Sequence, residues 1–353
     1  MKKELLTASA LAASLVVPGV ASAASFTLSG SSTNGVESED RDSASNDAYS
    51  ETQDSSMAVS VSETTDGGVT IASGFTLVNE GATSATESGL TLTFTDGSSL
   101  ELIDAGSAYG GALASVPSAS GEQGIGATSD NTSSTSLTWA DRNDGVGFDW
   151  NSAADSFGIE GLTVGISASM GDDTATGTDT LNTDESFSVG ATYVTTAGDS
   201  TVTIGGGYIQ SSGSMTNALN DISNSLAVSA SAVTGDLTVG IGFSSGEGLA
   251  QEGNDSVHEV DDVDVTRVGA SYVSGDMTFA VHWAEGSTAS GELGTAAPSS
   301  QDSQEVLGAS VDYVVASGVT ATLGYANEDE KVDGNAVDSN SGSAIYLGAA
   351  ISF

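Results

Sequence analysis

The sequence predicts an all-β fold, a transmembrane antiparallel β-barrel of about sixteen strands. Three observations predict it. Apolar residues alternate with small or polar residues, short and long connections take turns along the chain, and aromatic residues mark both ends of the apolar runs. A period of two places apolar side chains on one face of a strand and polar side chains on the other. A wall between lipid and water needs two such faces.

The first 23 residues predict a secretory signal peptide, leaving residues 24–353 as one barrel domain. Lys2 and Lys3 form a positive start, an apolar run follows from Leu5 to Val17, and small residues at 21–23 offer a cleavage site. A transmembrane helix is the alternative interpretation. The run is shorter than the about 20 residues that a helix needs to cross a bilayer, and no later segment is long and apolar enough.

The strand pattern is clearest in the second half of the chain. Phe187, Val189, Ala191 and Tyr193 alternate with small polar residues. Similar runs cover 202–208, 226–232, 237–243, 268–272, 277–283, 307–313, 319–325 and 345–353. Weaker patterns lie near 160–170, 145–151, 98–104, 89–95, 69–75, 56–63 and 25–32. Residues 133–140 fit either another strand or a loop, so totals of fourteen or eighteen stay open.

The connections alternate in length as a barrel meander requires. Tight turns with glycine lie at 195–200, 234–236, 274–276 and 316–318. Longer acidic and polar connections lie at 210–223, 244–262, 285–303 and 326–342. Short periplasmic turns at one end and long extracellular loops at the other are typical of outer-membrane barrels.

The aromatic residues predict two girdles, one at each membrane interface. One set ends its apolar runs before a short turn or at the chain end: Tyr193, Tyr272, Tyr313 and Phe353. The other set ends its runs before a long loop: Tyr208, Phe243, Trp283 and Tyr325. A soluble β-sandwich, the alternative, would place its largest side chains in the middle of the strands.

The composition excludes several classes of protein. The chain contains 48 Asp and Glu but only six Lys and Arg, for a formal net charge of -42. It therefore has no basic patch that could bind nucleic acid. The chain has no cysteine, which removes disulfides, thiolate metal sites and cysteine nucleophiles. The remaining chemistry is that of oxygen groups.

Several strands resemble those of the Gram-negative general porins, above all the Rhodobacter type. The resemblance lies in the segments 26–30, 189–193 and 268–272, and in the closing strand 346–353 with its terminal Phe353. It implies a sixteen-stranded barrel in outer-membrane lipid, usually a homotrimer, through which small hydrophilic solutes and ions diffuse passively. It also implies a third loop folded into the pore, and residues 105–144 occupy that place. A stretch of this length without a strand pattern is normally functional or disordered.

The sequence departs from that family in its basic residues. General porins face the acidic loop with a cluster of arginines, whereas residues 24–353 contain only Arg41, Arg142, Arg267 and Lys331. A strong field across the pore is therefore not expected.

The charge pattern predicts a cation-selective pore, because carboxylates that line a water-filled lumen attract cations. Glu101 and Arg267 alternate with apolar neighbours and should point inward. Within and beside the loop we predict charges at the constriction: Asp104, Glu122, Asp130, Asp141 and Asp144, with Arg142 as an internal partner. The alternative is that most of these are solvated loop side chains without a special role.

The excess of acid goes beyond what cation preference needs, and we hypothesise a saline habitat, a halophile in which salt screens the carboxylates. At about 1 M salt the Debye length is roughly 3 Å. Calcium bound by acidic loops is another explanation. Residues 141–145 have only a faint likeness to a calcium loop, so no metal site and no cofactor are assigned.

Three other functions were weighed. An enzyme could use the segment 242–246, which has the nucleophile-elbow pattern, but that motif needs a following helix, and His258 and His282 are isolated. A secreted adhesin would show repeats of fixed length, which the unequal loops lack. A substrate-specific porin fits the same pattern as a general one, and nothing in the sequence separates the two.

Overall fold

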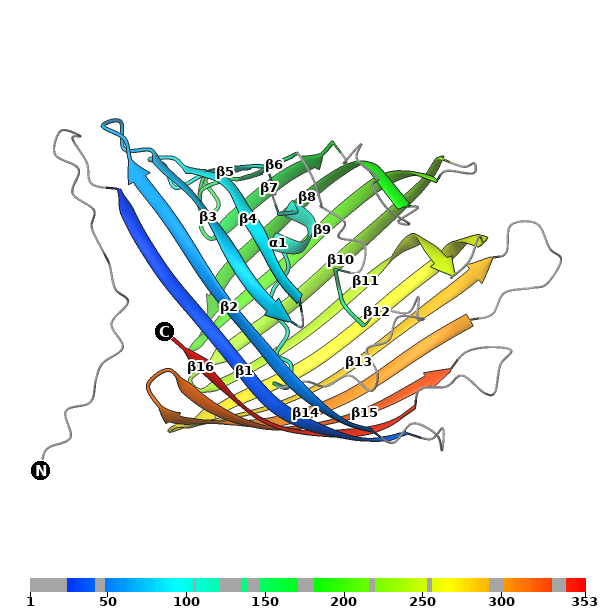
Figure 1. Ribbon diagram of the computed structural model, residues 1–353. Coiled ribbons are helices and arrows are strands. Elements are labelled where there is room, and N and C mark those ends of the chain that lie inside the picture. The colour runs from blue at the N-terminus through cyan, green and yellow to red at the C-terminus, as the bar shows by residue number, and fades with distance from the viewer. Residues whose placement is uncertain are drawn as a thin grey trace, which may run out of the picture.

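Sixteen strands close into one antiparallel barrel in the computed structural model (Figure 1). The structure describes residues 24–41, 48–80, 82–103, 106–120, 135–138, 147–170, 181–215, 220–252, 256–291, 301–331 and 341–353. The predicted signal peptide, 1–23, lies outside the described residues.

Each strand pairs with its neighbours in the chain, and β16 pairs with β1 to close the ring. The strands are β1 (Ser25–Arg41), β2 (Ala48–Thr64), β3 (Thr70–Glu80), β4 (Ala82–Thr93), β5 (Ser99–Leu102), β6 (Gly147–Asn151), β7 (Leu162–Ser169), β8 (Leu181–Ala197), β9 (Ser200–Met215), β10 (Asn220–Thr234), β11 (Leu237–Glu252), β12 (Ser256–Ser274), β13 (Met277–Gly291), β14 (Gln301–Ala316), β15 (Val319–Lys331) and β16 (Gly342–Ser352). The predicted count of sixteen is confirmed. Of 133–140, the described residues 135–138 form a turn and no strand.

The strands extend well beyond the apolar runs that predicted them. β9 continues to Met215 and β10 already begins at Asn220, so most of the expected loop 210–223 is strand. The same holds on β11 and β12, whose ladder reaches Glu252 and Ser256. A ladder of backbone hydrogen bonds also forms in water, where the outward side chain can be polar. The apolar alternation therefore marks where a strand meets lipid and not where it ends.

Three of the short connections are two-residue turns with glycine first. Gly198, Gly235 and Gly275 have φ of 65°, 57° and 62°, a region that residues with a Cβ rarely adopt. Each joins consecutive strands at the end of the barrel where the chain terminus Phe353 lies.

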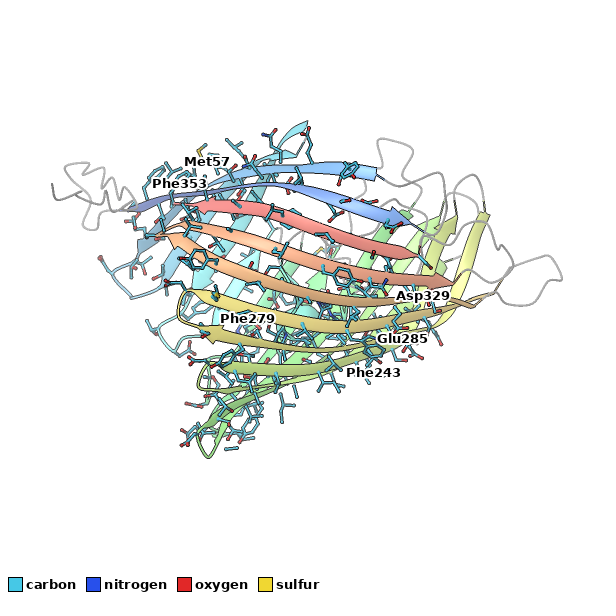
Figure 2. The ribbon with its side chains drawn as sticks, turned by 90° about the horizontal axis from the view of Figure 1, so that it is seen from below. Met57, Phe243, Phe279, Glu285, Asp329 and Phe353 are labelled. Atoms are coloured by element: carbon cyan, nitrogen blue, oxygen red, sulfur yellow. The ribbon has the colours of Figure 1, made fainter. Side chains whose placement is uncertain are left out.

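The apolar side chains point outward from the barrel. Leu226, Ile241, Leu323 and Leu347 are each more than half exposed, at 55%, 53%, 52% and 58%, and Phe243 and Phe279 stand on the same outer surface (Figure 2). Such a surface is stable only in hydrocarbon. The alternative of a soluble sandwich is wrong, because one closed sheet carries these residues on its outer face.

Helical structure is confined to α1 (Ala108–Gly111) in the part of the chain that the structure describes. Among those residues no helix has the length and apolar character to span a membrane.

Candidate functional site

The chain between β5 and β6 enters the barrel and follows its inner wall. Ser107 caps α1, its Oγ accepting a hydrogen bond from the Gly110 N–H at 3.0 Å. The helix contacts β7, β8 and β9, and Figure 1 shows it inside the barrel. Residues 106–120 and 135–138 are the described parts of the segment 105–144 that the sequence predicts as the constriction loop.

Wall side chains from successive strands bind the loop backbone. The loop N–H groups donate to acceptors on five strands: Ala108 to Ser167 Oγ (3.1 Å), Tyr109 to Ser188 Oγ (3.1 Å), Ala114 to Ser229 Oγ (2.6 Å), Ala119 to His282 Nδ1 (3.0 Å) and Ser120 to Ser310 Oγ (2.8 Å). A buried backbone N–H must be bonded, and these wall residues satisfy five N–H groups of the described loop between residues 108 and 120.

Glycines on the intervening inner positions let the loop lie close to the wall. A Cβ added at Gly190, Gly205 or Gly269 would collide with a backbone oxygen of Ala108, Ala112 or Pro117, respectively. We call the inner positions that receive the loop the loop track: Ser167, Ser188, Gly190, Gly205, Gly207, Ser229, Gly240, Gly269, His282 and Ser310.

The described loop presents one face to the wall and another to the lumen. Ala112, Ala114 and Ala119 are buried against the track, whereas Ser115 and Ser118 are exposed. Residues 106–120 contain no charged side chain. The predicted constriction charges lie outside the described residues, and their position stays a prediction: Asp104, Glu122, Asp130, Asp141, Arg142 and Asp144.

The two inward charges predicted on strands both lie on the inner face. Glu101 of β5 is directly opposite Asp149 of β6, and its Oε2 accepts a long hydrogen bond of 3.5 Å from the Gly106 N–H. Arg267 of β12 lies between Gly242 and Ala284 on the neighbouring strands.

Sequence reasoning missed most of the carboxylates on the inner wall. They share the phase opposite to the outward aliphatic residues on their strands: Glu37, Glu39, Asp54, Asp149, Asp312 and Glu328. The apolar alternation is weak around Glu37, Glu39 and Asp54 and hid their phase, whereas Val311 and Tyr313 on either side of Asp312 show it. The alternation of Val36 with Glu37 and of Leu323 with Tyr325 around Gly324 is the signal that could have revealed it.

The last described residue of the outbound loop is held by β14 and β15. The Ser120 Oγ donates to Asp312 Oδ2 at 2.7 Å, and Thr322 Oγ1 donates to Asp312 Oδ1 at 2.6 Å. Beyond this point Tyr346 of β16 is buried, with 2% of its surface exposed, and its ring occupies the space beside Gly35 and Gly348. The described part of the loop thus follows the wall from β7 to β14 and reaches the border with β15.

The aromatic residues of the predicted girdles stand on the outer surface. On the turn side these are Tyr193, Tyr272, Tyr313 and Phe353, and on the loop side Tyr208, Phe243, Trp283 and Tyr325. Trp283 is partly covered, and its indole N–H donates to Glu305 Oε1 at 2.7 Å. We call these sets the turn-side girdle and the loop-side girdle. Their contact with the membrane interfaces stays a prediction.

A closed barrel of sixteen strands is wide enough to enclose an aqueous channel. This one carries aliphatic side chains outside, and carboxylates, hydroxyls and an inserted loop inside. These features define the class of outer-membrane diffusion channels.

The family follows from the sequence match. Residues 7–333 match the model of the family described as Gram-negative porin, and the chain belongs to that family. It is a porin of the bacterial outer membrane. No curated protein matches the sequence.

Solved porins share the fold at low sequence identity. An anion-selective porin from Comamonas acidovorans is 13% identical with a TM-score of 0.64, covering 94% of this chain and 100% of that one. OmpT of Vibrio cholerae, in its trimer form, is 13% identical with a TM-score of 0.61, covering 94% and 99%. A mutant of Rh. blastica porin is 13% identical with a TM-score of 0.59, covering 93% and 100%.

Proposed function

We propose that this porin is a passive diffusion channel for small hydrophilic solutes and ions that prefers cations. The observation that carries the proposal is the charge of the described inner wall, where carboxylates outnumber the guanidinium of Arg267. The inward carboxylates are Glu37, Glu39, Asp54, Glu101, Asp149, Asp312 and Glu328. Fixed negative charge in a lumen concentrates cations and repels anions. An anion-selective porin has a similar fold, so side chains and not the fold set the sign.

The reversal potential in a planar bilayer under a salt gradient tests the proposal. The wild type should show a cation-directed potential. The triple variant Glu39→Gln, Asp54→Asn, Glu328→Gln should lose much of it, because it removes three inward charges. The matched control Glu285→Gln, Glu305→Gln, Asp329→Asn removes three charges from outward positions and should keep the potential. An anion-directed potential in the wild type contradicts cation preference.

A substrate-specific porin remains the alternative within the same family. A general channel passes a flux that rises in proportion to solute concentration, whereas the flux through a binding track saturates. Conductance over a wide range of salt, together with the swelling rate of liposomes over a range of neutral sugars, separates the two. We expect no saturation.

The proposal includes no catalytic step. The segment 242–246 is continuous strand in β11, whereas a nucleophile elbow needs a sharp turn from strand to helix. Ser244 is fully buried on the inner face. The side chain of His258 lies outside the described residues, and His282 binds the loop.

We further propose a homotrimer, and the outer face of β1 and β2 supports it. Four polar side chains there bond to one another, and we call them the polar quartet: Ser32, Asn34, Gln53 and Ser55. Asn34 Nδ2 donates to Ser32 Oγ at 3.1 Å, and Gln53 Nε2 donates to Asn34 Oδ1 at 3.3 Å. Each amide group has a second N–H, which hydrocarbon could not satisfy.

The strand register places the polar quartet at the height of the apolar band. Residues that pair across neighbouring strands form a row around the barrel, and each move to the next strand is one step. One such row leads from the turn-side girdle to the loop-side girdle in five steps: Tyr193, Ile204, Ala230, Ile241, Val268 and Trp283. A row that starts at Tyr313 of the turn-side girdle reaches Asn34 after three steps, through Ala321 and Ala349. The quartet therefore lies between the girdles, where a second copy of the chain would cover it.

The mass of the purified protein in mild detergent, measured by light scattering, tests the trimer. The wild type should have three times the mass of the chain, and the variant Asn34→Leu, Gln53→Leu should shift toward the monomer. Val239→Leu with Val281→Leu, on the outward face of β11 and β13, is the control and should stay trimeric. A wild-type monomer, or a trimer unchanged by the leucines, contradicts this interface.

The saline habitat is also a proposal. Glu285 lies directly opposite Glu305, and Glu305 directly opposite Asp329; Figure 2 labels the two ends of this row. Like charges in such positions destabilise a sheet unless salt screens them. Thermal stability should fall when NaCl is lowered from about 1 M to about 0.1 M.

Calcium added at constant ionic strength tests the other explanation of the acidity, which is calcium bound by the acidic loops. Among the described residues no group of three acidic or histidine side chains is placed to hold a metal.

A further inference from the structure

Tyr109 joins two parts of the constriction loop that are far apart in sequence. Its side chain is 0% exposed and packs with Ile209 of β9 and Ala227 of β10, while Leu113 of the loop adds to the same cluster. Its backbone N–H is bonded to Ser188 of β8. The residue is therefore anchored to three consecutive strands of the wall.

The phenol hydroxyl carries the connection to the returning part of the loop. It donates to the backbone oxygen of Leu137 at 2.8 Å and lies 2.9 Å from Ser225 Oγ. A phenol has one hydrogen to donate, and a carbonyl oxygen only accepts. Ser225 must therefore donate to Tyr109, so the hydroxyl connects β10 to the return limb, which we define as residues 135–138.

The return limb also lies against β11 through Leu137. Ser136 and Thr138 bond to each other. The Leu137 side chain is 8% exposed and occupies the space that a Cβ at Gly242 of β11 would need. Two described contacts of the limb with the wall are therefore the Leu137 side chain beside Gly242 and the bond from Tyr109. Because the barrel is closed around it, a return limb that leaves the wall can move only into the lumen.

We propose that Tyr109 is a positioning residue that sets the clearance of the pore by holding the return limb against β10 and β11. Its hydroxyl keeps the limb out of the lumen, so the channel stays at one conductance level. The proposal rests on the channel function proposed above. In this proposal one buried hydroxyl prevents brief partial closures of the single-channel current.

Single-channel recording of Tyr109→Phe tests the hydroxyl directly. The variant leaves the Leu137 oxygen without its partner, and the fraction of time spent in brief partial closures should rise roughly tenfold, the factor that corresponds to about 1.4 kcal/mol. The control Tyr193→Phe removes a hydroxyl from the outer surface and should record like the wild type. Ser225→Ala weakens the same anchor from the other side and should give a smaller rise.

A reversible cross-link supplies a readout that a loss of stability alone would not produce. The chain has no cysteine, so Leu137→Cys with Gly242→Cys introduces the only thiol pair. An ideal Cβ at Gly242 lies 3.3 Å from Leu137 Cγ, which is compatible with a disulfide. In the Tyr109→Phe background the oxidised pair should restore the steady current, and a reductant should bring the closures back.

The outcomes separate this proposal from the channel function. Wild-type protein without any conductance refutes the channel function and, with it, the effect of Tyr109 on the current. Steady currents in both Tyr109→Phe and Ser225→Ala, from barrels that unfold at the wild-type temperature, overturn the role of Tyr109. Closures that persist equally with and without the disulfide overturn it as well, since the moving part would then not be the return limb.

Discussion

The inner wall has two halves that differ in what covers them. From β7 to β14 the loop lies on it, and the inner residues are mostly Ser, Gly and Ala. On β15, β1 and β2 the inner positions carry carboxylates, among them Glu328, Glu39 and Asp54. The covered half behaves as a protein core, where small residues and bonded N–H groups are needed. The other half, which we call the open half because the described loop does not reach it, carries charge, and its Glu39 and Glu328 are 8% and 6% exposed.

The difference shows that the residue type at an inner position depends on whether the loop lies over it and not on which strand it belongs to. Asp312 illustrates it at the border between the halves, because both of its oxygens accept hydrogen bonds, one from the loop and one from β15. Asp54 in the open half has no hydrogen bond to a side chain within the described residues. The same residue type therefore bonds to the loop in one place and has no side-chain partner among the described residues in the other.

The largest effect is expected from Tyr346→Ala, in the open half. Its ring fills the space beside Gly35 and Gly348 and is 2% exposed. Its removal should lower the free energy of unfolding by about 3 kcal/mol, since a buried aromatic side chain leaves a cavity. Unfolding in urea followed by circular dichroism measures it. If the loss is no greater than that of Asp54→Asn, the open half contains no packed element and the comparison needs revision.

The second prediction concerns Gly269→Val in the covered half. The new side chain meets the Pro117 backbone oxygen, so the loop must shift away from the wall. We expect a loss of about 1–3 kcal/mol together with a changed single-channel conductance. Ala58→Val, on the inner face of β2, is the matched small-to-valine change in the open half and should leave conductance near that of the wild type. Equal effects of the two would show that the loop does not depend on the track.

Asp312→Asn should have an intermediate effect. It weakens two hydrogen bonds to a charged group, from Ser120 and Thr322, and each such bond contributes about 1.5–3 kcal/mol at most when buried. Because Asp312 is half-exposed, we expect a total loss of about 1 kcal/mol and faster hydrogen exchange at the Ser120 amide. Asp54→Asn is the control for the charge alone. Unchanged exchange at Ser120 would mean that Asp312 does not fasten the loop.

The smallest effect is expected outside the membrane, at Asp96 in the turn between β4 and β5. The Ser98 hydroxyl and backbone N–H donate to its carboxylate at 2.6 Å and 3.0 Å and lower the pKa of Asp96 below its ordinary value of 3.8. A lowered pKa adds stability above that ordinary value, and this stability is lost as pH falls through the folded pKa. Asp96→Asn should therefore melt slightly below the wild type at pH 7 and together with it in strong acid. A difference in melting temperature between the two proteins that grows in acid would contradict a lowered pKa of Asp96.

The strands could be predicted from the sequence where they meet lipid. The run from Leu226 to Ala232 lies within β10, and Leu307 to Tyr313 lies within β14, because hydrocarbon demands an apolar residue at every second position. Beyond the apolar runs the same strands continue with mostly polar residues on the outer face, and the pattern ends before the ladder does.

The inner wall could be predicted only in part. Glu101 and Arg267 alternate with apolar neighbours, which reveals which way they point. Glu37 has a single apolar neighbour of note in Val36, and its inward direction follows from pairing with Tyr346. The role of Tyr109 depends on Leu137 and Ser225, residues 28 and 116 positions away, and no local pattern contains such distances.

The sequence by itself determined the two-faced strand and its outward residues, and it predicted about sixteen strands and an acidic channel, because these features follow from neighbouring residues along the chain. Only the tertiary structure decided which half of the wall receives the loop, and therefore which inner positions are small and which are charged. A loop backbone needs hydrogen-bond partners from many strands at once, and these partners come together only when the barrel closes.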